Sequence, residues 1–189
     1  HLVCVHDRDL RRTATTDGVV STMSLAELEH LDFASWKNPW ADLDDEAEDV
    51  PAEHTSVLTM RKLLETVADY PRSVELAIET KHPTRYAGLV ERRLVELLDD
   101  FGWTGPDSPV RVMSFSLNAV ARVRKLAPAV PVVLLIEKAH HWPVLRQAVG
   151  RSWIMGPGIG ELTEHPGLGR HLVKAGRELH VWTVNTEEQ

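Results

Sequence analysis

Apolar segments of strand length alternate with segments of helical periodicity through most of this chain, and this alternation limits the folds open to it. Strands are predicted at 74–80, 110–113, 131–136 and 180–184. The stretches between them carry apolar residues at helical spacing. A helical connection of about ten residues or more joins parallel strands, because a tight turn joins only antiparallel ones. The pattern therefore predicts an α/β fold with a parallel sheet, as a layer or a barrel.

Side chains that can cap a helix stand before several of the helical segments. The predicted caps are Ser24, Thr59, Thr84 and Ser116. Ser24 also begins a capping box, since a glutamate follows it three residues later. Another segment, residues 36–56, is acidic and lacks apolar periodicity. We interpret it as a surface loop, because its carboxylates do not have the spacing of an EF-hand.

Composition excludes several classes of function. The chain has 189 residues, with 21 Lys and Arg against 28 Asp and Glu, and a formal net charge of −7. This acidic balance argues against nucleic acid or an anionic membrane as a partner. We find no apolar run of about 18 residues, so we expect no stable membrane insertion.

Length and cysteine content suggest how the chain is organised and where it works. A chain of 189 residues can bury one substantial core, so we expect a single domain over residues 1–189. The single cysteine, Cys4, cannot form an internal disulfide, which is compatible with a reducing compartment. The cysteine content therefore permits a location in the reducing cytoplasm.

The segment Val74–Lys81, VELAIETK, is a predicted strand with two unlike faces. Ile78 belongs to an apolar face, whereas Glu79 and Lys81 share the opposite one. A parallel strand covered by helices is normally apolar throughout, so the charged face indicates a cleft that holds ions or charged ligands. An edge strand with one solvated face would show the same alternation.

Polar or aromatic residues close the other predicted strands as well. The strand ends read VCV-HD, AIETK, VMSFS, LLIE and VWTVN. In parallel α/β folds, ligands bind at the C-terminal ends of the strands. The five ends therefore predict one shared site.

The side chains at these ends suit the hydrolysis of a phosphate diester. His6 could move a proton near neutral pH, with Asp7 orienting its ring. Glu79 could hold a divalent cation or act as a base, and Lys81 could receive an anion. Trp182 could form an aromatic wall. Each also has a plainer interpretation: a strand end entering a loop for His6, a surface ion pair for Glu79 with Lys81, and a core position for Trp182.

Several motifs occur in order along nearly the whole chain. They are HD-x-x-L-x-R-T from His6 to Thr13, S-L-A-E-L-x-x-L-D from Ser24 to Asp32, I-E-T-K from Ile78 to Lys81, SFS-x-x-A-x-x-x-V-R-x-L-x-P from Ser114 to Pro128, and A-G-x-x-x-x-V-W-T-V-N from Ala175 to Asn185. Each is common alone, but the combination is specific. In this combination the sequence resembles the glycerophosphodiester phosphodiesterase family.

The resemblance implies a fold, a reaction and roles for particular residues. The fold is a TIM-type (β/α)8 barrel, and the reaction is metal-dependent hydrolysis of small-molecule glycerophosphodiesters to sn-glycerol 3-phosphate and an alcohol, in a cytoplasmic enzyme of bacterial type. His6 matches one of two catalytic histidines, and Glu79 matches a ligand of the divalent cation, Ca²⁺ or Mg²⁺. Lys81 matches a residue of the phosphate region, and Trp182 matches a residue that lines the pocket.

The sequence also departs from the family pattern. Family members begin with a strand ending in His-Arg-Gly and a second strand with Glu-x-Asp, and they close with a strand ending in Thr-Asp. These motifs are not recognisable here, so we expect an incomplete barrel that lacks the first two strands and the last one. We expect this chain alone to bind metal poorly and to turn over little or no substrate.

Two alternatives to this function stay open. One is a non-catalytic, degenerate barrel that binds a phosphodiester or a protein partner. The other is a related barrel phosphodiesterase that acts on sphingomyelin or phosphoinositides. Trp36 and Trp40 in the acidic segment are compatible with the second alternative, since aromatic side chains bind at membrane interfaces.

Overall fold

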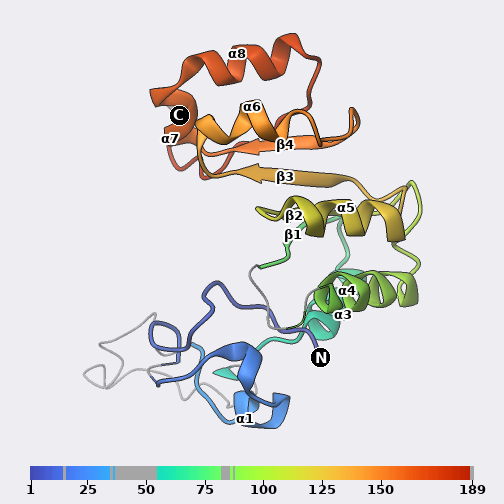
Figure 1. Ribbon diagram of the computed structural model, residues 1–189. Coiled ribbons are helices and arrows are strands. Elements are labelled where there is room, and N and C mark those ends of the chain that lie inside the picture. Colours follow the sequence, from blue (N-terminus) through green and yellow to red (C-terminus); the bar gives the residue numbers. More distant parts are fainter. Residues whose placement is uncertain (15, 35, 37–54, 82–85, 87, 188–189) are drawn as a thin grey trace. The chain divides into compact units, whose positions relative to one another are not determined.

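The computed structural model describes residues 1–14, 16–34, 36, 55–81, 86 and 88–187 (Figure 1). They belong to two compact units, His1–Pro71 and Arg72–Gln189. The single domain expected over residues 1–189 stays a prediction. The acidic loop expected at 36–56 lies largely outside the described residues, and the helix cap expected at Thr84 lies wholly outside them.

The N-terminal unit is built from short elements around a small apolar cluster. Its described elements are η1 (Val20–Thr22), α1 (Leu25–Glu29) and α3 (Met60–Ala68). The buried cluster consists of Leu10, Ala14, Leu28 and Val57. Two of the predicted caps are confirmed: the Ser24 hydroxyl accepts from the backbone of Glu27 at 3.3 Å, and the Thr59 hydroxyl accepts from Lys62 at 3.3 Å.

The strand predicted before His6 does not belong to a parallel sheet. Val3 forms a single antiparallel bridge with Thr59. The backbone of the flanking residues pairs with the same segment, since Cys4 N donates to Leu58 O and Met60 N donates to Leu2 O. The prediction of a parallel strand end at VCV-HD is therefore wrong, because these residues pair within their own unit.

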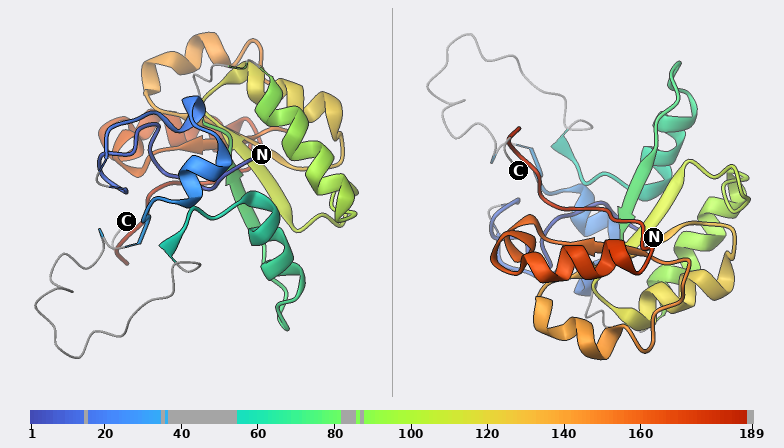
Figure 2. Two further views of the ribbon diagram at one scale, coloured as in Figure 1. Left: turned by 90° about the horizontal axis from the view of Figure 1, so that it is seen from below. Right: turned by 90° about the horizontal axis from the view of Figure 1, so that it is seen from above.

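The C-terminal unit holds a four-stranded parallel sheet in the order β1-β2-β3-β4 (Figure 2). The strands are β1 (Leu76–Glu79), β2 (Val110–Ser114), β3 (Val132–Ile136) and β4 (Ile154–Pro157). The helices between and after them are α4 (Leu89–Asp100), α5 (Leu117–Leu126), η4 (Ala139–His141), α6 (Trp142–Leu145), α7 (Ile159–Glu164) and α8 (Pro166–Lys174). The predicted α/β class with a parallel sheet is confirmed.

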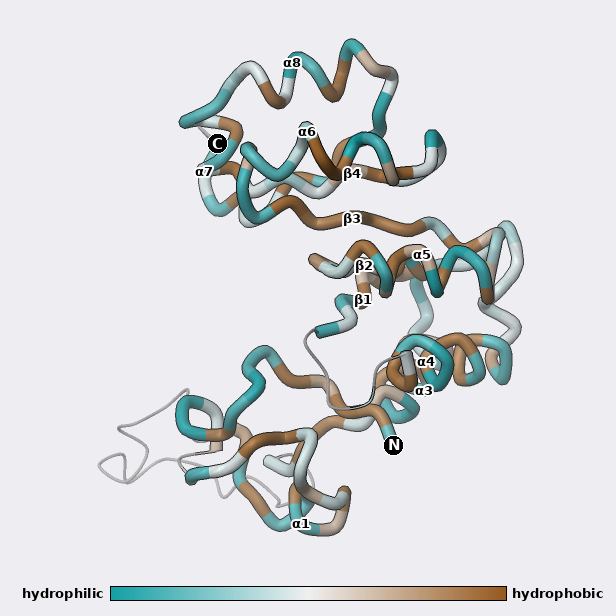
Figure 3. The backbone as a smooth tube through the Cα atoms, in the orientation of Figure 1, coloured by the Kyte–Doolittle hydropathy of each residue, from teal (hydrophilic) through white to brown (hydrophobic). Residues whose placement is uncertain are grey.

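The sheet has the burial pattern of a strand layer packed on both faces. All five residues of β3 are buried, and the strand is hydrophobic along its length (Figure 3). On one face, Val133, Leu135 and Ile154 form a cluster. Alternate residues such as Leu134 point to the other face. Helix α5 packs against β2 and β3, and the Ser116 hydroxyl caps it by accepting from Ala119 at 3.3 Å, as predicted.

The last predicted strand, 180–184, is replaced by two isolated parallel bridges, one to β4 and one to the residue that follows it. These join Met155 to Leu179 and Gly158 to Trp182. Around Met155 the hydrogen bonds follow a parallel ladder, and Trp182 N donates to Pro157 O at 3.3 Å. Between these bonds, a continuous ladder would need an N–H from Pro157 that donates to His180 O, and proline lacks this N–H. The pairing is therefore in the predicted direction but interrupted at Pro157.

Replacement of Leu134 by alanine should destabilise the protein. Leu134 is 0% exposed in β3, so the change removes buried apolar contacts and leaves a cavity. We expect the free energy of unfolding, measured by urea denaturation, to fall by about 3 kcal/mol. Leu126→Ala is the control, because Leu126 on α5 is 43% exposed and should cost less than about 1 kcal/mol. Equal losses in the two variants would contradict this assignment of the core.

Candidate active site

Glu79 and Lys81 lie at the C-terminal end of β1. Lys81 Nζ is 2.8 Å from Glu79 Oε2, and the lysine and glutamate side chains are 45% and 23% exposed. Between them, Thr80 is buried, and its backbone N–H donates to Met113 O at 2.8 Å. The Ser114 hydroxyl donates to Thr80 O at 2.8 Å. These bonds fix the end of β1 to β2 and leave both charged side chains on one face.

Strand β1 has the features of an edge strand and also carries the charged face expected of a cleft. Among the described strands, β1 is an edge of the sheet, and Glu79 and Lys81 form an ion pair. An exposed pair of this kind contributes about 0–1 kcal/mol to stability, so stability alone does not account for its position at the strand end. The roles of Glu79 on a cation and of Lys81 on an anion stay predictions.

Trp182 is held beside β4 by its side chain as well as by its backbone. Indole Nε1 donates to Gly156 O at 2.7 Å, and the ring packs on the cluster that contains Val133 and Leu135. A Cβ at Gly156 would lie 2.7 Å from Leu135 Cδ2 and 3.4 Å from His180 O. Glycine at this position therefore makes room for the Leu135 side chain of β3, whereas the backbone of the Trp182 segment lies at ordinary contact distance. The ring is half-buried, so Trp182 combines a core contact with an exposed surface.

Phe115 is a candidate site residue that the sequence interpretation missed. It follows β2 directly, is 43% exposed, and meets Trp182 edge to face with ring centroids 5.4 Å apart. Phe115 and Lys81 each lie two residues beyond the paired residues Met113 and Glu79. The signal in the sequence was its position in VMSFS, where an aromatic residue follows a strand end.

The connection after β3 is anchored by Glu161 on α7. Its carboxylate accepts from the backbone N–H of Ala139 at 2.7 Å and from Lys138 Nζ at 3.0 Å. The Ala139 bond and then the Lys138 bond lower the pKa of Glu161. The carboxylate therefore stays ionised near neutral pH and holds this loop at the C-terminal edge of the sheet.

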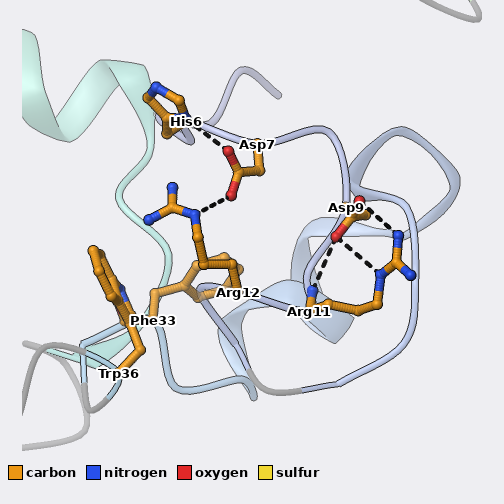
Figure 4. Close-up of polar contacts among 7 residues, drawn as sticks. All are labelled: His6, Asp7, Asp9, Arg11, Arg12, Phe33 and Trp36. Carbon is orange, nitrogen blue, oxygen red and sulfur yellow. Dashed lines mark hydrogen bonds and ion pairs between the residues drawn. The ribbon is translucent and has the colours of Figure 1, made fainter.

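His6 lies in the N-terminal unit, in a network with Asp7 and Arg12 (Figure 4). Its Nδ1 is 2.6 Å from Asp7 Oδ1, and its side chain is 77% exposed. Arg12 Nε donates to the other Asp7 oxygen at 2.5 Å. Hydrogen bonds from Arg12 and then His6 lower the pKa of Asp7 to about 2.

A second acidic and basic pair lies on the same segment. Arg11 Nη2 is 3.2 Å from Asp9 Oδ2 and makes no contact with His6. Exposed cationic side chains such as Arg11 and Arg12 can draw in an anionic substrate when their charge is unpaired. Each is instead paired with a carboxylate close in sequence, so the pairing reduces the positive charge that they present to an approaching anion.

The described residues do not make up a complete cation site. Among them, no group of three or more His, Cys, Asp and Glu side chains could hold a metal ion. Glu79 offers the hard oxygen donor that Ca²⁺ and Mg²⁺ prefer, but these ions require several such ligands. Glu79 alone therefore does not fit a tightly bound cation.

The structure groups the predicted site residues within each unit. Glu79 contacts Lys81, and Trp182 contacts Phe115, in the C-terminal unit. His6 contacts Asp7 in the N-terminal unit. A common site that includes His6 stays a prediction.

Charged and aromatic residues lie at the C-terminal edge of the parallel α/β sheet, which is the edge where barrel enzymes carry their active sites. The whole chain, residues 1–189, matches the Glycerophosphoryl diester phosphodiesterase family. The chain belongs to that family.

Named relatives agree with this membership. The chain is 40% identical over 192 aligned residues to a protein of Mycobacterium tuberculosis named "Probable glycerophosphodiester phosphodiesterase 1", and covers 68% of its length. It is 29% identical to the glycerophosphodiester phosphodiesterase of Bacillus subtilis, with 98% of this chain and 63% of that protein aligned.

Solved structures share the fold. A phosphodiesterase of Oleispira antarctica, in complex with the product sn-glycerol-3-phosphate, has a TM-score of 0.71 and 22% identity, covering 98% of this chain and 68% of that one. A glycerophosphodiester phosphodiesterase of Agrobacterium tumefaciens has a TM-score of 0.65 and 22% identity, covering 97% of this chain and 68% of that one. The predicted TIM-type barrel class is confirmed, and the described sheet supplies four of its strands.

The carboxyl group of Asp7 should titrate well below its ordinary pKa of 3.8, with a midpoint near 2. A lowered carboxyl pKa stabilises the folded state above pH 3.8, and this contribution is lost as the pH falls towards 2. Carbon-13 NMR of the Asp7 side chain would measure the midpoint. Arg12→Gln should raise it towards 3.8, and Arg11→Gln should leave it in place. A midpoint near 3.8 in the unchanged protein would contradict the network.

Proposed function

We propose that this protein hydrolyses glycerophosphodiesters to sn-glycerol 3-phosphate and an alcohol. The observation that carries the proposal is the family match over the entire chain. The 40% identity to a relative named for this activity supports it. The chemical types of the candidate residues support it as well, since they include a proton-transfer group, a cationic side chain for the phosphate and aromatic rings.

His6 is proposed as a general acid and base. Asp7 occupies its Nδ1, so Nε2 is the ring nitrogen that can exchange a proton with the substrate. When the glycerol 2-hydroxyl or a water attacks phosphorus, the P–O bond to the alcohol breaks, and a proton must reach the leaving alkoxide. Nε2 of His6 is suited to give that proton, or to take one from the attacking group.

The substrate is proposed to bind to Lys81, Trp182 and Phe115. The Lys81 ammonium can donate to phosphate oxygens and stabilise charge that develops there. Phe115 and Trp182 form an aromatic wall along the same edge of the sheet. Such a wall would orient the glycerol or alcohol part of the diester by contact with its apolar surface.

Glu79 is proposed as one ligand of a divalent cation, Ca²⁺ or Mg²⁺. A bound cation would neutralise negative charge on the phosphate oxygens. Since Glu79 is a single carboxylate, any cation also needs ligands beyond the described residues. The same observation favours the second candidate function, a non-catalytic barrel that binds a phosphodiester without turnover.

The cytoplasmic location and the bacterial type of the enzyme stay predictions. Within the described residues, no helix is both long enough and apolar enough to cross a bilayer. The proposed partner is a small-molecule glycerophosphodiester, in line with the family match and the acidic composition.

His6→Gln should lower kcat about a hundredfold or more, because it removes the proposed proton-transfer group. Release of sn-glycerol 3-phosphate from glycerophosphodiesters by the complete protein would measure the rate. His30→Gln is the matched control, since His30 lies in the same unit and its Nδ1 bonds the backbone of Ala26. A near-normal rate for His6→Gln would remove His6 from the mechanism. No turnover in the unchanged protein, with phosphodiester binding retained, would favour the non-catalytic barrel.

Glu79→Gln should weaken binding of Ca²⁺ or Mg²⁺ about tenfold or more, measured by isothermal titration calorimetry of the complete protein. The amide has the shape of the carboxylate but lacks its charge. Glu75→Gln is the control, because Glu75 precedes the same strand and pairs with Arg111 at 3.0 Å. Equal cation affinity in all three proteins would exclude Glu79 as a ligand.

A further inference from the structure

We propose that Asp7 and Arg12 are positioning residues that hold the His6 imidazole in the tautomer with its proton on Nδ1, leaving Nε2 for the substrate. This inference rests on the proposed function, in which His6 exchanges a proton during hydrolysis. It assigns a purpose to two side chains that touch neither phosphate nor cation in that proposal.

Asp7 uses both of its carboxylate oxygens in this network. Oδ1 contacts His6 Nδ1 at 2.6 Å, and Oδ2 accepts from Arg12 Nε at 2.5 Å (Figure 4). Among the described residues, Asp7 is the only hydrogen-bond partner of the His6 ring. Because the ring is otherwise exposed, the Asp7 contact decides both its orientation and its tautomer.

The charge of Asp7 determines which atom donates. The Arg12 guanidinium and the His6 ring hold the pKa of Asp7 at about 2, so the carboxylate is ionised at neutral pH. An ionised carboxylate can only accept hydrogen bonds, so His6 Nδ1 must carry the proton. A neutral imidazole has one ring proton, and Nε2 therefore keeps a free lone pair.

Arg12 is itself held by contacts away from the histidine. Its guanidinium carbon lies 4.9 Å from the centre of the Trp36 ring, in a cation–π arrangement. Trp36 Nε1 in turn donates to Phe33 O at 3.0 Å. Phe33 packs against the buried cluster of the N-terminal unit, so the network is tied to the core of that unit.

The neighbouring pair of Asp9 and Arg11 provides an internal comparison. Arg11 donates to Asp9 from two side-chain nitrogens, Nε at 3.4 Å and Nη2 at 3.2 Å. Neither residue forms a hydrogen bond or an ion pair with His6 (Figure 4). If such pairs only stabilised this segment, changes in either pair would alter catalysis equally. A positioning role predicts that only changes at Asp7 and Arg12 alter the His6 tautomer and kcat.

The test measures the tautomer and the rate separately in the complete protein. Nitrogen-15 NMR of the His6 ring reports which nitrogen carries the proton, and steady-state kinetics with a glycerophosphodiester separates kcat from KM. Variants Asp7→Asn and Arg12→Gln would be compared with Arg11→Gln, after circular dichroism has confirmed their fold. Asp7→Asn should shift the tautomer population towards Nε2–H and lower kcat about tenfold or more with little change in KM.

Arg12→Gln should produce a smaller change of the same kind, because Asp7 keeps its contact with His6. Arg11→Gln should leave the tautomer and kcat unchanged. An unaltered tautomer population in Asp7→Asn would overturn the proposal, even if the rate fell. A shifted tautomer with normal kcat would overturn it as well. A normal rate in His6→Gln would instead contradict the proposed catalytic role of His6. The tautomer measurement does not depend on that rate, so the two results can be told apart.

Discussion

All four described strands of the C-terminal unit run in the same direction, and the placement of the candidate site depends on this parallel pairing. Parallel pairing brings the residues that follow each strand to one edge of the sheet. Glu79 ends β1 at this edge and Lys81 lies just beyond it, while Phe115 follows β2 at the same edge. The hydroxyl of Ser114 strengthens the arrangement, since it bonds the backbone of Thr80 and joins the ends of the two strands.

Features encoded by local sequence could be predicted, whereas features that depend on distant partners could not. The caps at Ser24, Thr59 and Ser116 follow from one side chain and the next three residues, and all three are present. The contact between Phe115 and Trp182 joins segments far apart in the sequence, so no local pattern contained it. The prediction of a parallel strand before His6 was wrong for the same reason, because the sequence did not show which segment pairs with residues 2–5.

In the candidate site too, local features could be predicted and contacts between distant segments could not. The charged face of β1 was readable from alternation alone, and the ion pair of Glu79 with Lys81 agrees with it. The break at Pro157 was also readable in principle, since proline lacks the N–H that a ladder needs. It was missed because the segment that pairs with β4 could not be identified without the register.

In each unit, a cationic side chain near a candidate residue is already paired with a carboxylate. Lys81 contacts Glu79 and Arg12 contacts Asp7, and these side chains are all partly exposed. Dissolved salt screens such pairs and the attraction of an anionic ligand together. An anion that reaches Lys81 must compete with the Glu79 carboxylate. Salt weakens the ion pair of Lys81 with Glu79 as well as the attraction of Lys81 for the anion. The affinity for such a ligand should therefore depend less steeply on ionic strength than it would at an unpaired lysine.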